Sequence, residues 1–200
     1  MKIDPDTYER SLYRTMTGAV VPRPIGWIST TSEDGVDNLA PYSFFNVVTV
    51  APPILMFAPA NTGDADPDGM KDTARNAVVT GEFVVNVVTE PLAEAMNETS
   101  ATLPPEESEF DHAGLERAAS EKVTPPRVAA VEIAFECELY DHVQVGASTM
   151  VLGEIVLAHV DDALTTDEGK LDVERVDAVG RLAGNWYART SDRFRLERPD

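Results

Sequence analysis

A regular alternation of apolar and polar residues runs through the second half of the chain. Between residues 131 and 139 every second position is apolar: Val131, Ile133, Phe135, Cys137 and Leu139. A period of two predicts a strand with one buried face, here over residues 128–140. A further strand is predicted over residues 149–160. Cys137 is then a packed strand residue, and as the only cysteine it excludes an intrachain disulfide.

The first half contains shorter apolar stretches separated by turn residues. Residues 24–32 mix aromatic and β-branched side chains, and Asp34-Gly35 offers a turn, which predicts a hairpin into residues 38–50. Short apolar runs predict strands over residues 52–59 and 83–89. An exposed last strand is predicted over residues 192–199.

Two segments have the signals of short helices. Residues 68–82 predict the first, which can begin at Asp68 or Asp72 and end at Gly81. Residues 90–103 predict the second, since a proline is acceptable near a helix start.

Residues 102–127 are rich in proline and charge, and we interpret them as a surface excursion within a single domain over residues 1–200. Several short strands with few helices predict a mainly β fold, an antiparallel barrel with short helices.

The charge balance narrows the classes of partner. With 35 Asp+Glu against 16 Lys+Arg, the formal charge is −19, which opposes binding to nucleic acid or to an anionic membrane. Because the carboxylates are spread along the chain, the composition is typical of a halophile's protein, and we expect unfolding in dilute buffer. Full stability there would contradict this reading. No apolar run has the roughly 18 residues of a membrane span, and the first residues lack a signal-peptide core, so a cytoplasmic location is expected.

Several common motifs are absent from the sequence. It lacks G-x-G-x-x-G, the Walker lysine motif, H-E-x-x-H and G-x-S-x-G. His112, His142 and His159 do not have the spacing of metal ligands. We therefore expect neither a metal site nor a catalytic triad.

One polar patch lies on the predicted hairpin. Hydroxyl and amide side chains occur there among aromatic residues: Ser29, Thr30, Thr31, Asn38, Ser43 and Asn46 beside Trp27, Tyr42, Phe44 and Phe45. This mixture suits a flat ligand that stacks on one face and forms hydrogen bonds at its edges. The alternative, ordinary strand and turn residues around core aromatics, stays open.

A different patch lies at the start of the first predicted helix, where Lys71, Asp72 and Thr73 follow one another. The free N–H groups of a helix N-terminus favour an anion, and a lysine and a hydroxyl add donors. The alternative is a solvated turn in which Lys71 pairs with Asp68 or Asp72. Together the two patches describe a ligand with a phosphate and a planar ring.

Four blocks of the sequence carry a resemblance to a known family. They are "RPIGWISTTSEDGVDNLAPYSFFNVVTVAPPILMF", "KDTARNAVVTGEFVVNVV", "VGASTMVLGEIV" and "GRLAGNWYA", in this order. With these blocks the chain, over about residues 12–190, resembles the flavin reductase-like family of FMN-binding split β-barrel proteins.

The resemblance implies a six-stranded Greek-key barrel and a homodimer that holds FMN at the barrel rim near the subunit interface. It implies that the flavin site is lined by Trp27, Ser29, Thr30 and Thr31 and by the segment with Asn38, Ala40, Ser43 and Asn46. It assigns the phosphate to the Lys71, Asp72 and Thr73 block. Trp186 and Tyr187 match a closing motif near the cofactor or the partner subunit.

The implied function is hydride transfer from reduced NAD(P)H to flavin and on to a free flavin, a partner oxygenase or an electron carrier. FAD is a possible alternative to FMN. Related reductases often carry a G-D-H segment associated with nicotinamide binding, whereas this chain has Gly146-Ala147-Ser148, preceded by His142. Two alternatives therefore stay open: a noncatalytic FMN electron carrier, and a binding module without flavin, or with haem on His142 or His159.

Overall fold

The structure, a computed structural model, describes residues 1–62 and 69–199. Its strands are β1 (Gly26–Thr31), β2 (Asp37–Tyr42), β3 (Phe45–Val50), β4 (Pro53–Phe57), β5 (Glu82–Val87), β6 (Arg117–Ala118), β7 (Arg127–Val128), β8 (Ile133–Val145), β9 (Ser148–Val160), β10 (Val179–Arg181) and β11 (Tyr187–Arg189). Its helices are α1 (Tyr13–Ala19), α2 (Asp72–Thr80), α3 (Ala93–Glu98) and α4 (Glu109–His112), with short 3-10 helices η2 (Glu90–Leu92) and η3 (Asp162–Leu164).

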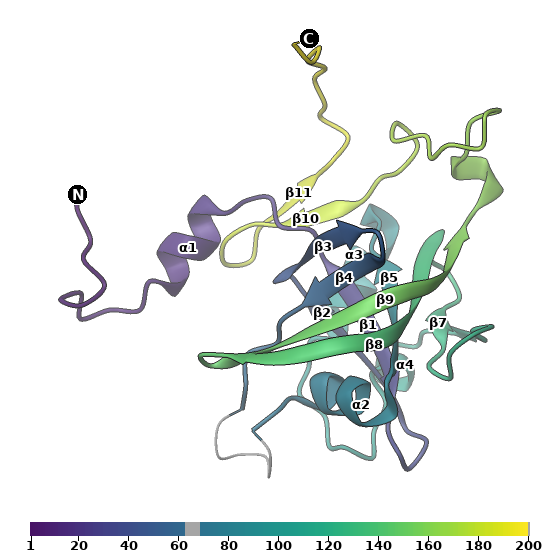
Figure 1. Ribbon diagram of the computed structural model, residues 1–200, viewed down its shortest axis with the longest axis horizontal. Helices are drawn as coiled ribbons and strands as arrows, with labels where there is room; N and C mark the ends of the chain where they lie inside the picture. The colour runs from purple at the N-terminus through teal and green to yellow at the C-terminus, as the bar shows by residue number, and fades with distance from the viewer. Residues whose placement is uncertain (63–68, 200) are drawn as a thin grey trace.

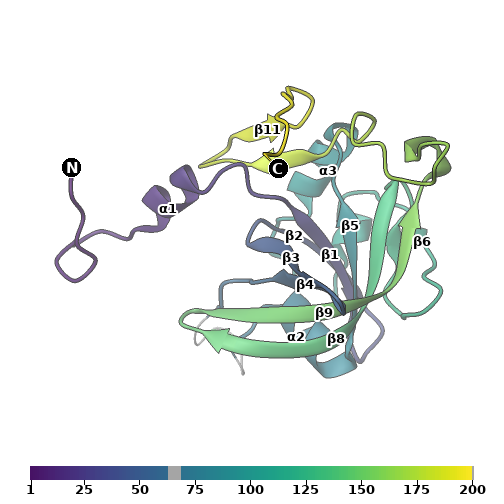
Figure 2. The same cartoon turned by 45° about the horizontal axis from the view of Figure 1, so that its top comes forward.

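The fold is mainly β, as predicted, and its main sheet is antiparallel. Seven strands form this sheet in the order β2-β1-β5-β8-β9-β4-β3, where six were expected. The two edge strands, β2 and β3, are separated in the chain only by Ser43 and Phe44. The sheet therefore curls back on itself, which gives the barrel-like body in Figures 1 and 2.

A glycine marks the place where the barrel closes. A Cβ atom on Gly26 of β1 would lie 2.7 Å from the ring of Phe45 on β3. Only glycine leaves room for this ring, so the first strand and the far edge strand can approach each other.

The inside of the curled sheet is filled by a hydrophobic core against which α2 packs. The fully buried residues of this core include Ile28, Phe57, Phe83, Cys137 and, from α2, Ala74 and Ala77. Ala74 and Ala77 thus form the buried face of α2. Cys137 is fully buried in this core, and burial raises the pKa of its thiol, which disfavours the thiolate.

A second core lies on the outer face of the sheet. It joins Trp27 and Leu39 to Met96 of α3, Phe110 of α4 and Val179 of β10. The 102–127 segment therefore contributes a fully buried aromatic residue and covers one face of β1 and β2.

Several predicted boundaries differ from the structure. The first helix spans 72–80 and has Lys71 at its N-cap without a side-chain cap bond, whereas Gly81 ends it in a left-handed conformation as expected. Asp68, the other proposed cap, lies outside the described residues. The second helix is shorter than predicted, since α3 ends at Glu98.

The prediction of a last strand over residues 192–199 is wrong, because this segment has no regular structure. The C-terminal strands are instead β10 and β11, which pair with each other. Each has only three residues, too few for an alternation to be recognised. Among the described residues, no helix is long and apolar enough to cross a membrane.

Candidate functional site

A cleft at the start of α2 brings five of the predicted residues together. This α2 cleft has a volume of about 130 Å³, and its predicted residues are Asn38, Ala40, Lys71, Asp72 and Thr73. The opposite wall comes from residues 99–102 and Glu109. Strand β2 and helix α2 thus position the two predicted polar patches next to each other.

A chain of hydrogen bonds runs along the floor of the α2 cleft. The Tyr42 hydroxyl donates to Thr73 Oγ1 (2.9 Å), and Thr73 Oγ1 donates to Asn38 Oδ1 (2.6 Å). Asn38 Nδ2 then donates to both carboxylate oxygens of Glu109 (3.0 and 2.9 Å). Burial raises the pKa of Tyr42, so its phenol keeps the proton that it donates.

These hydrogen bonds affect the expected role of Thr73 in binding a phosphate. A hydroxyl has one proton, and that of Thr73 is directed at Asn38. Thr73 could donate to a phosphate oxygen only by giving up its hydrogen bond to Asn38. Otherwise the phosphate oxygens must accept hydrogen bonds from other groups. Those donors are Lys71 and the free N–H groups in the first turn of α2.

Lys71 is exposed and has no ion-pair partner within residues 1–62 and 69–199. Its alternative partner Asp72 is instead paired with Arg75, one turn along α2, at 2.6 Å. Asp68 lies outside the described residues. The positive charge at the helix start is therefore not compensated by Asp72.

The outer edge of β2 also faces this region. Leu39 N donates to Glu109 rather than to β1, so Leu39 and, by alternation, Pro41 direct their backbone groups away from the sheet. Pro41 has no N–H and presents only its carbonyl oxygen. An edge of this kind can accept hydrogen bonds from the rim of a flat ligand.

A neighbouring cleft contains two further predicted residues. This Tyr187 cleft has a volume of about 200 Å³, includes Ser43 and Tyr187, and shares Pro41 and Ser100 with the α2 cleft. The Arg181 guanidinium lies 4.5 Å from the centre of the Tyr187 ring, which stabilises the position of that ring. Trp186 is 76% exposed and lies outside both clefts.

The three hydroxyls on β1 do not lie together. Thr30 faces α2, where its hydroxyl accepts from Asn76 Nδ2 (3.2 Å). Ser29 and Thr31 point to the opposite face, where they donate to the Pro126 carbonyl and to Asp37 (2.8 Å), respectively. Successive side chains of a strand alternate between its faces, which separates these neighbours.

Two more predicted residues serve other positions. Trp27 is fully buried in the second core and donates from Nε1 to Thr99 Oγ1 (2.8 Å). Asn46 is exposed on the edge strand β3, where its Oδ1 accepts from Val47 N (2.8 Å). Neither residue lines the α2 cleft.

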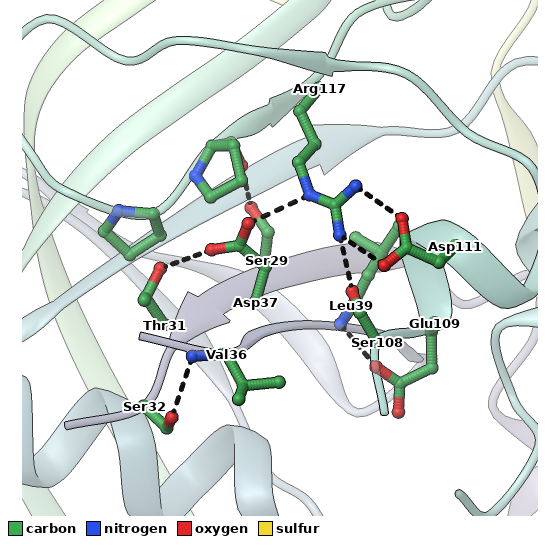
Figure 3. A network of polar contacts seen from close by, with 12 residues as sticks. Ser29, Thr31, Ser32, Val36, Asp37, Leu39, Ser108, Glu109, Asp111 and Arg117 are labelled. Carbon is green, nitrogen blue, oxygen red and sulfur yellow. Dashed lines mark hydrogen bonds and ion pairs between the residues drawn. The ribbon is translucent and has the colours of Figure 1, made fainter. Parts of the chain in front are cut away.

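Sequence reasoning missed Glu109 and the arginine that holds its segment. Burial raises the pKa of Glu109, although hydrogen bonds from Leu39 and Asn38 oppose this effect. Nearby, Arg117 binds Asp37 (2.9 Å), Asp111 (2.7 Å) and Ser108 (2.9 Å), as Figure 3 shows. The available signal was Phe110, a single large apolar residue in a charged stretch.

The histidines and the segment that replaces G-D-H lie elsewhere. Gly146 and Ala147 form the tip of the β8–β9 hairpin, and His142 is exposed on β8. His159 Nε2 lies 2.6 Å from Glu136, a fully buried carboxylate. Within the described residues, no group of three or more His, Cys, Asp or Glu could hold a metal.

Comparison with known proteins decides the family. A family model, the flavin reductase like domain, matches residues 17–175. The chain belongs to this family. A protein of Aquifex aeolicus is 41% identical over 187 residues, 94% of each chain.

Similar solved structures agree with the assignment of this chain to the flavin reductase-like family. Component B of nitrilotriacetate monooxygenase from Bacillus cereus superposes with a TM-score of 0.91 and 35% identity over 98% of each chain. The 2-nitrobenzoate 2-nitroreductase NbaA of Pseudomonas fluorescens gives 0.88 and 33% over 100% of this chain and 96% of its own. A flavin reductase with a split barrel domain from Shewanella frigidimarina, at 22% identity, gives 0.82 over 100% of both chains and so shares the fold.

Proposed function

We propose that this protein is an FMN-dependent oxidoreductase of the flavin reductase type. The observation that carries the proposal is the α2 cleft, where Lys71, which has no ion-pair partner among the described residues, meets a helix N-terminus and the open edge of β2. A cationic helix start suits a phosphate, and a strand edge suits the rim of a flavin ring. The residues present therefore fit FMN.

Each wall of the cleft has a role in this proposal. Lys71 and the first turn of α2 bind the phosphate, and the Tyr42–Thr73–Asn38–Glu109 chain fixes the floor beneath the ribityl group. The outer edge of β2 orients the ring, and Tyr187, stacked under Arg181, closes the ring end. When bound, FMN supplies the redox chemistry, taking a hydride from reduced NAD(P)H and passing electrons to a flavin or protein acceptor.

Two relatives support the enzyme over the electron carrier. The B. cereus protein is named as a component of a monooxygenase and the P. fluorescens protein as a nitroreductase. A partner oxygenase is accordingly one proposed electron acceptor. The noncatalytic carrier remains the second candidate, because Gly146-Ala147-Ser148 replaces the segment associated with nicotinamide binding.

The test combines binding with reduction. We expect Lys71→Ala to weaken FMN about 10- to 100-fold and to leave riboflavin almost unchanged, because only FMN offers a phosphate to a charge-assisted hydrogen bond. Fluorescence titration measures both ligands, and Lys122→Ala, at an exposed lysine outside the cleft, is the matched control. Equal losses for FMN and riboflavin would contradict the phosphate role.

The electron donor is tested on the same protein. Anaerobic addition of NADH and then NADPH should bleach the flavin absorbance of the loaded protein. Loaded protein that neither nucleotide bleaches would favour the electron carrier. Protein that takes up no flavin would exclude both.

A homodimer is also part of the proposal. Edge strand β3 exposes Val47, Val48 and Val50, and α1 exposes Tyr13 and Met16. Figures 1 and 2 show α1 extending from the body. Exposed apolar patches of this kind mark protein interfaces. Light scattering that gives the mass of one chain would refute the dimer.

A further inference from the structure

A third cleft adjoins the α2 cleft on the side away from Tyr187. This acidic cleft has a volume of about 400 Å³ and shares Asn38, Asp72 and Glu109 with the α2 cleft. The Tyr187 cleft meets the α2 cleft at Pro41 and Ser100 instead. The three clefts therefore follow one another, with the α2 cleft in the middle.

Carboxylates dominate the walls of the acidic cleft. Six acidic side chains line it: Glu33, Asp34, Asp72, Glu106, Glu107 and Glu109. Arg75 is the one basic residue among its described lining residues, and it is engaged by Asp72 at 2.6 Å and by the Met70 carbonyl at 2.8 Å. The excess of negative charge makes this cleft unfavourable for a second anion.

The acidic wall is also held in place. Pro104 and Pro105 restrict the backbone of the rim. Immediately after the rim, Ser108 and Asp111 are bound by Arg117, which also binds Asp37 at the start of β2 (Figure 3). These bonds fix the backbone next to the rim, so Glu106 and Glu107, whose side chains are exposed, keep their negative charge at the cleft in any rotamer.

We propose that the acidic cleft makes the site selective for a flavin with one terminal phosphate, FMN, over FAD. This inference rests on the proposed function, with the ring towards Tyr187 and the phosphate at Lys71. A ligand that continues past this phosphate enters the acidic cleft. The second phosphate of FAD then meets Glu106 and Glu107 rather than a lysine, so like charges act against FAD and not against FMN.

The test measures the FMN and FAD dissociation constants in the lowest salt that preserves the native far-UV circular dichroism spectrum. We expect FAD to bind at least about 10-fold more weakly than FMN. The double variant Glu106→Gln with Glu107→Gln should reduce this ratio about threefold or more and change FMN affinity less than about twofold. Glu33→Gln provides a second variant on another wall of the cleft.

The matched control is Glu132→Gln with Glu138→Gln, which removes the same charge from exposed residues that line neither cleft. It should leave the ratio unchanged. Equal binding of FMN and FAD by the native protein would overturn the inference, as would an unchanged ratio in both cleft variants. Failure to bind either flavin would instead refute the proposed function.

Discussion

Both faces of β1 carry hydroxyl side chains, but these side chains contact different parts of the molecule. On the covered face, Trp27 and Ser29 donate to Thr99 and Pro126, which belong to the segments packed over the sheet. On the other face, Thr30 lies beside Asn76 of α2, and α2 leads to the cleft. Because successive side chains of a strand point to opposite faces, neighbouring hydroxyl residues have different roles. Those on the covered face stabilise the packing of the covering segments, and Thr30 on the other face lies near the candidate site.

Two buried carboxylates extend this comparison to the 102–127 segment. Glu136 of β8 accepts from the backbone N–H groups of Glu121 and Lys122 and so fastens one end of the segment to the covered face. Glu109 reaches from the segment to Leu39 and Asn38 at the cleft. Glu136 therefore only fixes the 102–127 segment to the sheet, whereas Glu109 connects this segment to the α2 cleft.

The largest effect should separate the two tryptophans that the sequence proposed for the site. Trp27→Ala should lower the free energy of unfolding by about 3–5 kcal/mol, because it removes a fully buried ring and its hydrogen bond. Trp186→Ala should change it by less than about 0.5 kcal/mol, since that ring is 76% exposed. Denaturant unfolding measures both free energies. Similar losses for the two variants would contradict the assignment of Trp27 to the core and of Trp186 to the surface.

A smaller loss is expected at Glu136. Burial pushes its pKa up, but hydrogen bonds from His159 and two backbone N–H groups outweigh burial and hold the pKa below the ordinary 4.5. Glu136→Gln should cost about 1–3 kcal/mol at neutral pH, because it places an amide against those donors.

The pH dependence of this loss has a defined sign. A lowered pKa contributes stability above pH 4.5 that is lost as the pH falls through the folded-state value. The advantage of the native protein over Glu136→Gln should therefore shrink in acid. Unfolding curves at several pH values measure it, and a constant difference would argue against a charged Glu136.

The smallest effect is expected at Glu109, with the opposite sign. Burial raises its pKa above the ordinary 4.5, so its contribution to stability is present below pH 4.5 and is lost as the pH rises through the raised value. Relative to Glu109→Gln, the native protein should lose stability over that range, by less than about 1 kcal/mol. Unfolding curves at several pH values measure this change. If the stability difference changed with pH in the same direction for Glu109→Gln as for Glu136→Gln, the distinction between these two carboxylates would be refuted.

Local signals explain what could be predicted from the sequence. Alternation over residues 131–139 located the first part of β8, which starts at Ile133 and continues to Val145, beyond the predicted end at residue 140. Gly81 marked the end of α2 because only its missing Cβ makes the left-handed conformation easy. The Lys71, Asp72 and Thr73 block could be placed at a helix start because a helix N-terminus depends on nearby residues.

Long-range packing explains what could not be predicted. The outer face of the sheet needs a cover, and the 102–127 segment supplies it, although its charges favour an exposed loop. Glu109 is buried by that packing and reaches Asn38, a residue 71 positions away in the chain. Strands β10 and β11 depend on each other and on neighbouring segments rather than on their own pattern.

The Ser43-Phe44 link has a meaning for how this family can change over evolutionary time. Because it joins the two edge strands of the sheet directly, its length limits how far those edges can separate. Exposed turns elsewhere, such as the one between β8 and β9, can gain or lose residues without opening the body. Differences in length among relatives should therefore accumulate in exposed turns, while the two-residue link between the edges keeps its length.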